Sequence, residues 1–275
     1  MIKSTPRTVI IRPRPMPARG KCTKRLGDSI HAWAVMQATP APVVLPFEAF
    51  VPFAPLFENQ GLPVVANAKG SRWVARPGGH WPGPEHGHHV RDTMARAAGA
   101  EHDRLGAMLK PLPGLIRSGT YAVVCPNSAI GYKEWPETSW SQVIEECLGQ
   151  GLAVVIASQP ARERIHAPHG AEFLDVSVVG LARLLAHASC VLAPDSGPVH
   201  LADALGVPAV GLYGATSTMT YGPYRDKSFC IDMHKELYPR GERYNSARHL
   251  PDADMAMIGI DRVLEAMKRA VSSVA

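Results

Sequence analysis

The sequence contains no hydrophobic stretch long enough to cross a membrane. None of its apolar runs approaches the roughly 18 residues that a membrane-spanning helix needs. The N-terminus is basic, but its apolar stretch, Thr8–Ile11, is too short for the hydrophobic part of a signal peptide. We therefore predict a cytoplasmic protein.

Cysteine is scarce and scattered. The five cysteines lie at positions 22, 125, 147, 190 and 230, and no two of them form a CxxC pair. We therefore expect buried free thiols rather than a disulfide or a zinc site. Four histidines, at positions 80, 86, 88 and 89, gather in a loop rich in glycine and proline. Such a loop lacks the rigid scaffold of a metal site, so no metal is predicted and an acceptor-side loop is the preferred interpretation.

Acidic residues are absent before Asp28. Eight of the 29 Lys and Arg residues precede it, whereas all 24 acidic residues lie from Asp28 onward. This asymmetry indicates either a solvated basic arm or an anionic partner, such as a phosphorylated glycan or the surface of the inner membrane. No nucleic-acid motif or row of aromatic side chains accompanies the basic residues, so no nucleic-acid partner is expected.

Strand and helix patterns alternate along almost the whole chain, which is typical of a parallel, doubly wound α/β sheet. Strands are expected at Thr8–Ile11, Val43–Leu45, Val64–Ala66, Tyr121–Cys125, Leu152–Ala157, Phe173–Val176, Cys190–Ala193 and Ala209–Tyr213. Helices are expected at Ser29–Ala38, Phe50–Asn59, Arg91–Ala98, Ser139–Leu148, Arg162–His166, Leu181–His187, Pro198–Leu205 and Asp254–Val271. Arg91 and Arg96 are expected on a solvated helix face. Residues 103–118 have several prolines and glycines and no strong periodicity, so we interpret them as a linker.

An apolar strand at 190–193 runs through a short turn directly into a helix. Asp195 or Ser196 can cap this helix, and Pro198 suits its first turn. Gly206 then ends it. The free N–H groups and the positive dipole end of such a helix favour a phosphate or diphosphate, which we predict to bind there. The alternative is a well-capped strand–helix unit without a ligand.

A longer pattern surrounds this turn. The segments DSGPVHLADALGVPAVGLYGATS (195–217) and YGPY (221–224) resemble the donor-site signature of glycosyltransferase family 9, the ADP-heptose:lipopolysaccharide heptosyltransferases. Asp203 departs from that signature, because the family usually has alanine there. The resemblance implies that the donor or its phosphates are bound by Asp195, Ser196, Gly197, Pro198, His200, Gly214 and Thr216. For His200, a buried structural histidine is an equal alternative.

The same resemblance implies a GT-B type fold with two Rossmann-like domains. Residues 1–118 would form an abbreviated acceptor-side domain, and residues 119–275 the domain that binds the nucleotide sugar. The likeness is almost continuous over residues 119–275. In the N-terminal half it is confined to the first turn.

Lys133-Glu134-Trp135-Pro136 is similar to the family's K-x-W-P motif, which lies between a strand and a helix. A lysine there can neutralise the donor diphosphate and stabilise the charge that develops on the departing phosphate. The alternative is a surface lysine beside a core tryptophan. Ser128 and Glu163 are predicted contacts of the ribose or the base.

The segment KRLGDSI (24–30) resembles the family's G-D-x-[LIV] turn, and the resemblance implies that Asp28 is the catalytic base. Inverting transfer needs a carboxylate that takes the proton of the acceptor hydroxyl while the sugar–phosphate bond breaks on the opposite face. The alternative role for Asp28 is a helix N-cap, because Asp-Ser before an apolar helix suits that position.

Together these features predict an inverting glycosyltransferase that needs no cofactor. It would transfer heptose or a related sugar from an ADP-sugar to a glycan acceptor such as the lipopolysaccharide core. A catalytically inactive nucleotide-sugar-binding module is the main alternative, and an enzyme of the related sugar epimerase class is a third. No Walker A motif, GxGxxG fingerprint or Ser-His-Asp order supports an NTPase, a dehydrogenase or a hydrolase.

Overall fold

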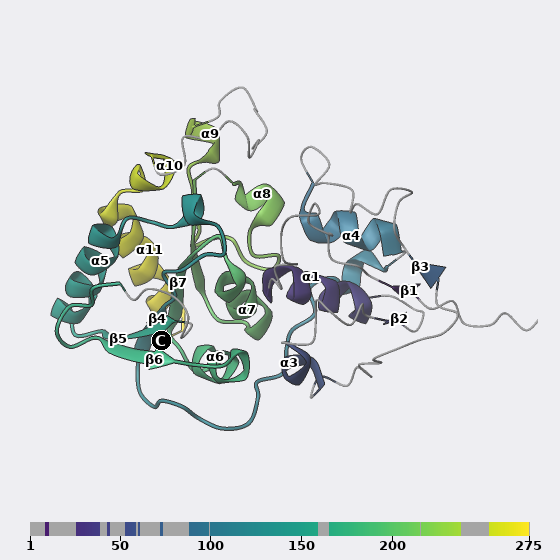
Figure 1. Cartoon of the computed structure of the whole chain (residues 1–275), viewed down its shortest axis with the longest axis horizontal. Helices are drawn as coiled ribbons and strands as arrows, with labels where there is room; N and C mark the ends of the chain where they lie inside the picture. The colour runs from purple at the N-terminus through teal and green to yellow at the C-terminus, as the bar shows by residue number, and fades with distance from the viewer. Residues whose placement is uncertain are drawn as a thin grey trace, which may run out of the picture. The chain divides into compact units, whose positions relative to one another are not determined.

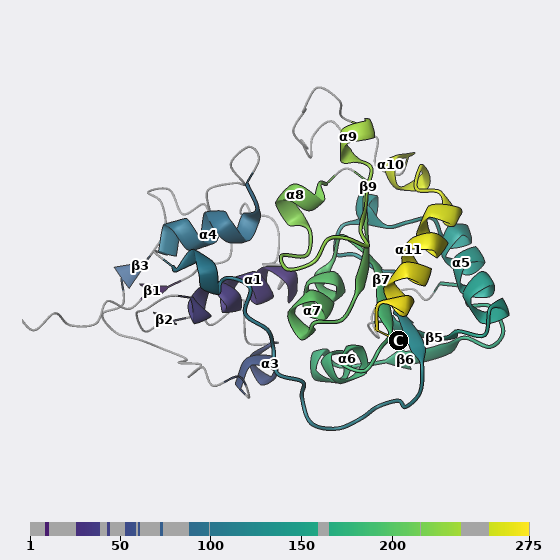
Figure 2. The same ribbon diagram turned by 180° about the vertical axis from the view of Figure 1, so that it is seen from behind.

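The computed structural model describes residues 9–10, 26–38, 43–44, 53–58, 60, 72–73, 88–98, 100–158, 165–214, 216–237 and 253–274. The chain divides into two compact units, Met1–Lys110 and Pro111–Ala275, which Figures 1 and 2 show from two sides. Each unit contains a parallel sheet accompanied by helices, so the predicted α/β class is confirmed. We predicted the boundary between residues 118 and 119, whereas the two units of the structure meet between Lys110 and Pro111.

The first unit contains a small parallel sheet. Its described elements are β1 (Val9–Ile10), α1 (Leu26–Gln37), β2 (Val43–Val44), α3 (Ala54–Glu58), β3 (Arg72–Trp73), α4 (Val90–Ala98) and the 3-10 helix η1 (His102–Arg104). Strand β1 pairs in parallel with β2 on one side and β3 on the other. Strand β3 was not predicted, and the strand expected at Val64–Ala66 lies outside the described residues.

The core of the first unit contains a buried arginine. Arg91, at the start of α4, is only 1% exposed, so the prediction of a solvated side chain is wrong. Its guanidinium Nη1 donates to the carbonyl oxygen of Leu105 at 2.8 Å, and Nε donates to Nδ1 of His31 at 3.2 Å. These partners compensate the loss of hydration that burial imposes on the side chain. Arg96, further along the same helix, is exposed as expected.

The predicted linker has no regular structure after η1, but its start packs into the first unit. Leu105 and Leu109 are buried there. The backbone N–H of Lys110 donates to the Gln60 side chain at 2.8 Å, and that side chain donates back to the Lys110 carbonyl oxygen at 3.0 Å. This part of the chain is therefore attached to the first unit through buried leucines and hydrogen bonds, although Met108 and Lys110 are exposed.

The second unit carries the larger sheet. Its described strands are β4 (Tyr121–Val124), β5 (Ala153–Ser158), β6 (Glu172–Asp175), β7 (Cys190–Pro194), β8 (Ala209–Tyr213) and β9 (Ile231–Asp232). They pair in parallel in the order β6-β5-β4-β7-β8-β9. This is the order of a Rossmann-type sheet, in which the chain reverses its direction of travel across the sheet between the two central strands, here β4 and β7.

Helices cover both faces of this sheet. The described helices are η2 (Gly131–Lys133), α5 (Glu137–Gly149), α6 (Val178–Leu185), α7 (Gly197–Leu205), α8 (Thr218–Tyr221), α9 (His234–Leu237), α10 (Ala253–Ala256) and α11 (Ile260–Ser272). In both ribbon views α5 and α11 lie on one face, and α6 and α7 lie on the other. Strands β4, β7 and β8 are buried along their whole length, which explains their unbroken apolar sequences.

Several elements of the second unit differ from the prediction. The helix expected over Asp254–Val271 is interrupted, because Gly259 has extended backbone angles and precedes a new helix. Helix α6 begins three residues earlier than expected, because Ser177 caps it by accepting from the Gly180 N–H at 3.2 Å. The helix expected at Arg162–His166 lies largely outside the described residues, while α8, β9 and α9 were not predicted.

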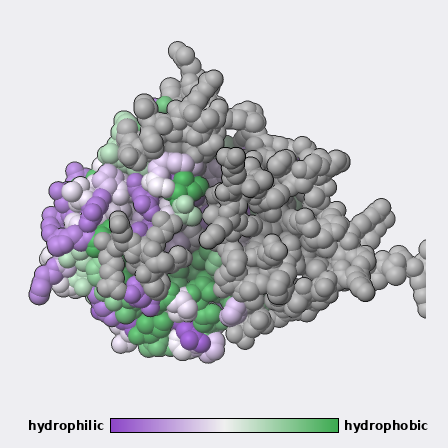
Figure 3. Space-filling view, in the orientation of Figure 1, coloured by the Kyte–Doolittle hydropathy of each residue, from purple (hydrophilic) through white to green (hydrophobic). Residues whose placement is uncertain are grey.

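The surface of the second unit is uneven in polarity. Figure 3 shows hydrophilic residues over α5, and hydrophobic residues gathered over α6 and the chain that leads into β4. Within the part of the chain that the structure describes, no helix is long and apolar enough to span a membrane. Cys125, Cys147 and Cys190 are buried free thiols, as predicted, and Cys230 is half-buried.

Candidate functional site

The candidate site lies where the order of the sheet reverses. Strands β4 and β7 pair side by side and in parallel, so their carboxyl ends meet at the same edge. Residues that follow β4 include Ser128 and Lys133, and the residues that follow β7 are Asp195 and Ser196. Ligands of open α/β sheets bind at this position, in the crevice outside the carboxyl ends of the strands.

At the start of helix α7, at this edge of the sheet, a serine hydroxyl makes no hydrogen bond to the described residues. Ser196 occupies the N-cap position, with extended angles of φ −151° and ψ 171°, but its side chain makes no capping hydrogen bond. Ser196 is therefore the cap residue by position, as one of the two predicted candidates, but it contributes no side-chain capping bond. The Ser196 Oγ is buried and has no hydrogen-bond partner among the described residues. At the other end Gly206, at φ 77°, closes the helix in the left-handed conformation, as predicted.

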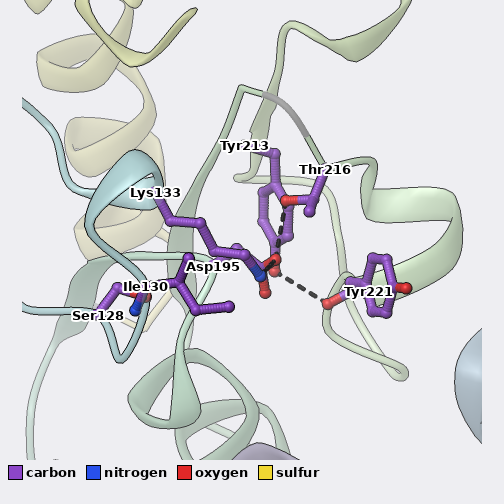
Figure 4. A network of polar contacts seen from close by, with 7 residues as sticks. All are labelled: Ser128, Ile130, Lys133, Asp195, Tyr213, Thr216 and Tyr221. Carbon is purple, nitrogen blue, oxygen red and sulfur yellow. Dashed lines mark hydrogen bonds and ion pairs between the residues drawn. The ribbon is translucent and has the colours of Figure 1, made fainter. Parts of the chain in front are cut away.

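The carboxylate of Asp195 interacts with two other side chains of the site. Its Oδ2 pairs with the ammonium of Lys133 and accepts a hydrogen bond from the Thr216 hydroxyl at 2.8 Å. The Asp195 side chain is 6% exposed and that of Lys133 is 14% exposed. Figure 4 shows Lys133 reaching across from the β4 side, while Thr216 approaches Asp195 from the turn after β8. The structure thus brings three predicted site residues into direct contact.

Trp135, two residues after Lys133, packs in the core of the second unit. The indole Nε1 donates to the carbonyl oxygen of Ile258 at 3.1 Å, and the ring meets Trp140 edge-on with centroids 5.2 Å apart. Trp135 is therefore a core residue, as the alternative interpretation of this motif expects. Lys133 itself is mostly buried and paired, so the alternative of a surface lysine is wrong.

Ser128 helps to shape the loop that follows β4. Its hydroxyl accepts from the backbone N–H of Ile130 at 3.3 Å, and its own N–H donates to the Glu134 carboxylate at 2.8 Å. Ser128 is buried, and the close-up places it in the loop that leads to Lys133. Glu163, the other predicted nucleoside contact, lies outside the described residues.

Two tyrosines complete the cluster, and neither was predicted. The ammonium of Lys133 lies 5.6 Å from the centre of the Tyr221 ring, a distance typical of a cation–π contact. The Tyr213 hydroxyl donates to the carbonyl oxygen of Tyr221 at 3.3 Å (Figure 4). Burial, followed by the nearby carboxylate of Asp195, raises the pKa of Tyr213 well above its usual value, so its phenol stays protonated. The YGPY motif pointed to the segment that contains Tyr221, but it did not indicate which residue the tyrosine contacts.

The remaining predicted residues are placed as follows. His200 is buried one turn into α7, and Gly214 is buried directly after β8. Asp28 belongs to the first unit and is half-buried in the first turn of α1. Because α1 begins at Leu26, Asp28 is not its N-cap residue. Among the residues that the structure describes, no group of three or more His, Cys, Asp or Glu side chains could hold a metal ion.

Comparison with known proteins identifies the family of the chain. Residues 91–250, more than half of the chain, match the sequence profile of glycosyltransferase family 9 (heptosyltransferase). Lipopolysaccharide heptosyltransferase 3 of Escherichia coli is 26% identical over 160 residues, which cover 52% of this chain and 47% of that protein. The chain thus spans about half the length of this curated relative.

Solved structures of low sequence identity share the fold. The family 9 glycosyltransferase of Veillonella parvula superposes with a TM-score of 0.67 at 14% identity, covering 98% of both chains. TibC of enterotoxigenic E. coli H10407, an iron-containing dodecameric heptosyltransferase, superposes in its complex with ADP-D-beta-D-heptose with a TM-score of 0.65. That match has 17% identity and covers 98% of this chain and 77% of TibC. The profile match and the Rossmann-type sheet together show that this chain belongs to glycosyltransferase family 9, the heptosyltransferase family.

Proposed function

We propose that this protein transfers heptose, or a closely related sugar, from an ADP-sugar to a glycan acceptor such as the lipopolysaccharide core. The second unit would bind the donor. The observation that carries the proposal is the buried Lys133–Asp195–Thr216 cluster at the edge where the sheet reverses, beside the start of α7. The ADP-heptose complex of TibC, which has the same fold, supports the choice of donor.

The chemistry of the cluster suits a diphosphate. The first N–H groups of α7 and the buried Ser196 hydroxyl are donors at the positive end of a helix dipole. Lys133 adds an ammonium, which has three donors, of which the ion pair with Asp195 uses one. In this proposal Asp195 does not touch the phosphates, because its carboxylate would repel them. It holds Lys133 and Thr216 in place instead.

The reaction would proceed with inversion at the sugar carbon. Asp28 would take the proton of the acceptor hydroxyl as that oxygen attacks, while the bond to the diphosphate breaks on the opposite face. Lys133 and the α7 amides would stabilise the negative charge that develops on the departing ADP. The base assignment rests on the G-D-x-[LIV] resemblance and on the place of Asp28 in the first turn of α1.

Further residues would complete the donor site and contact the acceptor side. Ser128 and Glu163 would contact the nucleoside, while His200 and Gly214 would line the donor side. The basic residues before Asp28 would contact an anionic surface, that of the glycan acceptor or of the inner membrane at its cytoplasmic face.

A transfer assay tests the proposal directly. Wild type, Asp28→Asn and Lys133→Ala are each incubated with ADP-heptose and a heptose-free lipopolysaccharide core, and the acceptor is then weighed by mass spectrometry. We expect wild type to add one heptose. Asp28→Asn should be slower by a factor of about 10² to 10⁴, the usual contribution of a general base, while it still binds ADP.

The same assay separates the alternative function. If wild type and Asp28→Asn bind ADP but neither modifies the acceptor, the chain is a nucleotide-sugar-binding module without transfer activity. Release of free sugar and ADP without an acceptor would instead favour epimerase-type chemistry. Equal transfer by wild type and Asp28→Asn would overturn the assignment of the base.

A further inference from the structure

A short segment that follows Thr216 is fastened at both of its ends by carboxylates. We refer to residues 217–226, which contain α8, as the tyrosine turn. At its start, Asp232 Oδ2 accepts from the Thr218 N–H at 2.7 Å, from the Thr218 hydroxyl at 2.6 Å and from the Ser217 hydroxyl at 3.1 Å. One carboxylate oxygen thus fixes the entry into α8.

The other end of the tyrosine turn is fastened by Asp203. This side chain lies on α7 and is 4% exposed. Its two oxygens accept hydrogen bonds from the backbone N–H groups of three consecutive residues: Tyr224 at 2.9 Å, Arg225 at 3.1 Å and Asp226 at 3.1 Å. Bonds from N–H groups to an ionised carboxylate are stronger than those between neutral groups. They also satisfy a charge that would otherwise be costly to bury.

Between its two fastened ends the turn presents Tyr221 to the candidate site. The ammonium of Lys133 lies over the Tyr221 ring, 5.6 Å from its centre, and the Tyr221 carbonyl oxygen accepts from the Tyr213 hydroxyl. Directly after it, Gly222 packs so tightly that an added Cβ would collide with the carbonyl oxygen of Thr218. The Gly222 contact keeps α8 itself compact, while the bonds to Asp232 and Asp203 restrain the two ends of the turn.

We propose that Asp203 is a positioning residue that holds the tyrosine turn in place, so that Tyr221 covers Lys133 and keeps its ammonium directed at Asp195. This gives a role to the residue that departs from the alanine typical of the family signature. The consequence for donor binding rests on the proposed role of Lys133. The position of Tyr221 over the Lys133 ammonium does not depend on that role.

The reactivity of Lys133 toward an amine-acetylating reagent measures this cover. The rate is followed by mass spectrometry of the peptide that contains Lys133, with the exposed Lys268 of the same protein as internal reference. In Asp203→Ala we expect Lys133 to react about tenfold faster relative to Lys268, because three bonds to a charged acceptor are lost and the turn opens more often. Asp203→Asn, which keeps one acceptor oxygen, should lie between this variant and wild type.

A double variant shows whether Asp203 acts through Tyr221. Tyr221→Ala alone should raise the rate at Lys133 by a similar factor, and Asp203→Asn/Tyr221→Ala should react no faster than Tyr221→Ala. Glu145→Gln, which removes an exposed carboxylate from the same unit, should react like wild type. If Asp203→Ala does not fold, Asp203→Asn and its combination with Tyr221→Ala decide the question.

Two outcomes would overturn the inference: a folded Asp203 variant whose Lys133 reacts like that of wild type, or factors for Asp203 and Tyr221 that multiply in the double variant. Acetylation of the wild type in the presence of ADP separates this test from that of the proposed function. Protection of Lys133 by ADP supports the donor site. Its absence would count against the donor site while leaving the comparison of variants fully informative about Asp203.

Discussion

The ammonium of Lys133 and the carboxylate of Asp195 form an ion pair between residues 62 positions apart in the sequence. Lys133 follows β4 and Asp195 follows β7, and these strands are neighbours because the sheet reverses its order between them. The pair therefore depends on the topology of the sheet. It places a cation beside the start of α7 and fixes its direction.

The Asp195 carboxylate should contribute clearly to stability. Asp195→Asn keeps an acceptor for Thr216 but removes the charge that faces Lys133. Because both side chains are largely buried, we expect the free energy of unfolding to fall by about 2 kcal/mol, between the values of exposed and fully buried pairs. Urea unfolding measures this change. Lys133→Met/Asp195→Asn should lose less than the sum of the two single changes, and strict additivity would contradict the coupling.

Gly211 in β8 leaves room for the Tyr213 ring. A Cβ at Gly211 would lie 2.7 Å from Cε2 of Tyr213 and 3.1 Å from the sulfur of Cys230. Gly211→Ala should therefore destabilise the protein by about 1–3 kcal/mol, as overpacking of a core does. Gly149→Ala is the matched control, since an added Cβ there meets nothing within 4 Å. In thermal melts the control should match or slightly exceed wild type, and equal melting of both variants would refute the packing argument.

Trp135→Phe should loosen the loop that carries Lys133. The change keeps an aromatic ring but leaves the carbonyl oxygen of Ile258 without the indole N–H that it now accepts from at 3.1 Å. An unsatisfied buried acceptor costs about 1–3 kcal/mol, and we expect a loss of this size in urea unfolding. An unchanged free energy of unfolding would mean that the hydrogen bond contributes nothing.

Alkaline pH should weaken the fold through its buried thiols. Burial raises the pKa of Cys125 and of Cys190 from 9.0 to about 12. Between these values the unfolded chain releases protons that the folded protein keeps, so the free energy of unfolding falls as pH rises. Unfolding in urea at about pH 8 and about pH 10.5 should show this loss, and Cys125→Ala should show a smaller one. An equal loss in the variant would contradict the assignment to Cys125.

The half of the site that is local in sequence could be predicted. The run from Cys190 to Gly206 contains an apolar strand, a proline suited to a first helical turn and a glycine at the helix end, and the structure confirms that strand and helix. Local rules were enough here because each signal lies within a few residues of the element that it determines.

The contacts between distant segments could not be predicted in the same way. The carboxylate of Asp203 accepts from backbone N–H groups 21 to 23 positions later. Because every residue except proline has such a group, the sequence does not show which of them bind Asp203. Arg91 looks like a surface residue in its helical pattern, but its partners, His31 and Leu105, come from other elements. The break before α11 depends on the extended backbone of Gly259, which the apolar stripe of residues 254–271 conceals.

The binding of ADP to the folded protein tests the central claim most directly. Isothermal calorimetry would compare wild type with Lys133→Ala, using Glu145→Gln as a control for the loss of an exposed charge. The donor-site account predicts that ADP binds wild type and the control alike, and that Lys133→Ala binds at least about tenfold more weakly, because a charge-assisted bond to phosphate is lost. If ADP does not bind, or binds Lys133→Ala as tightly as wild type, the cluster around Lys133 is not a diphosphate site.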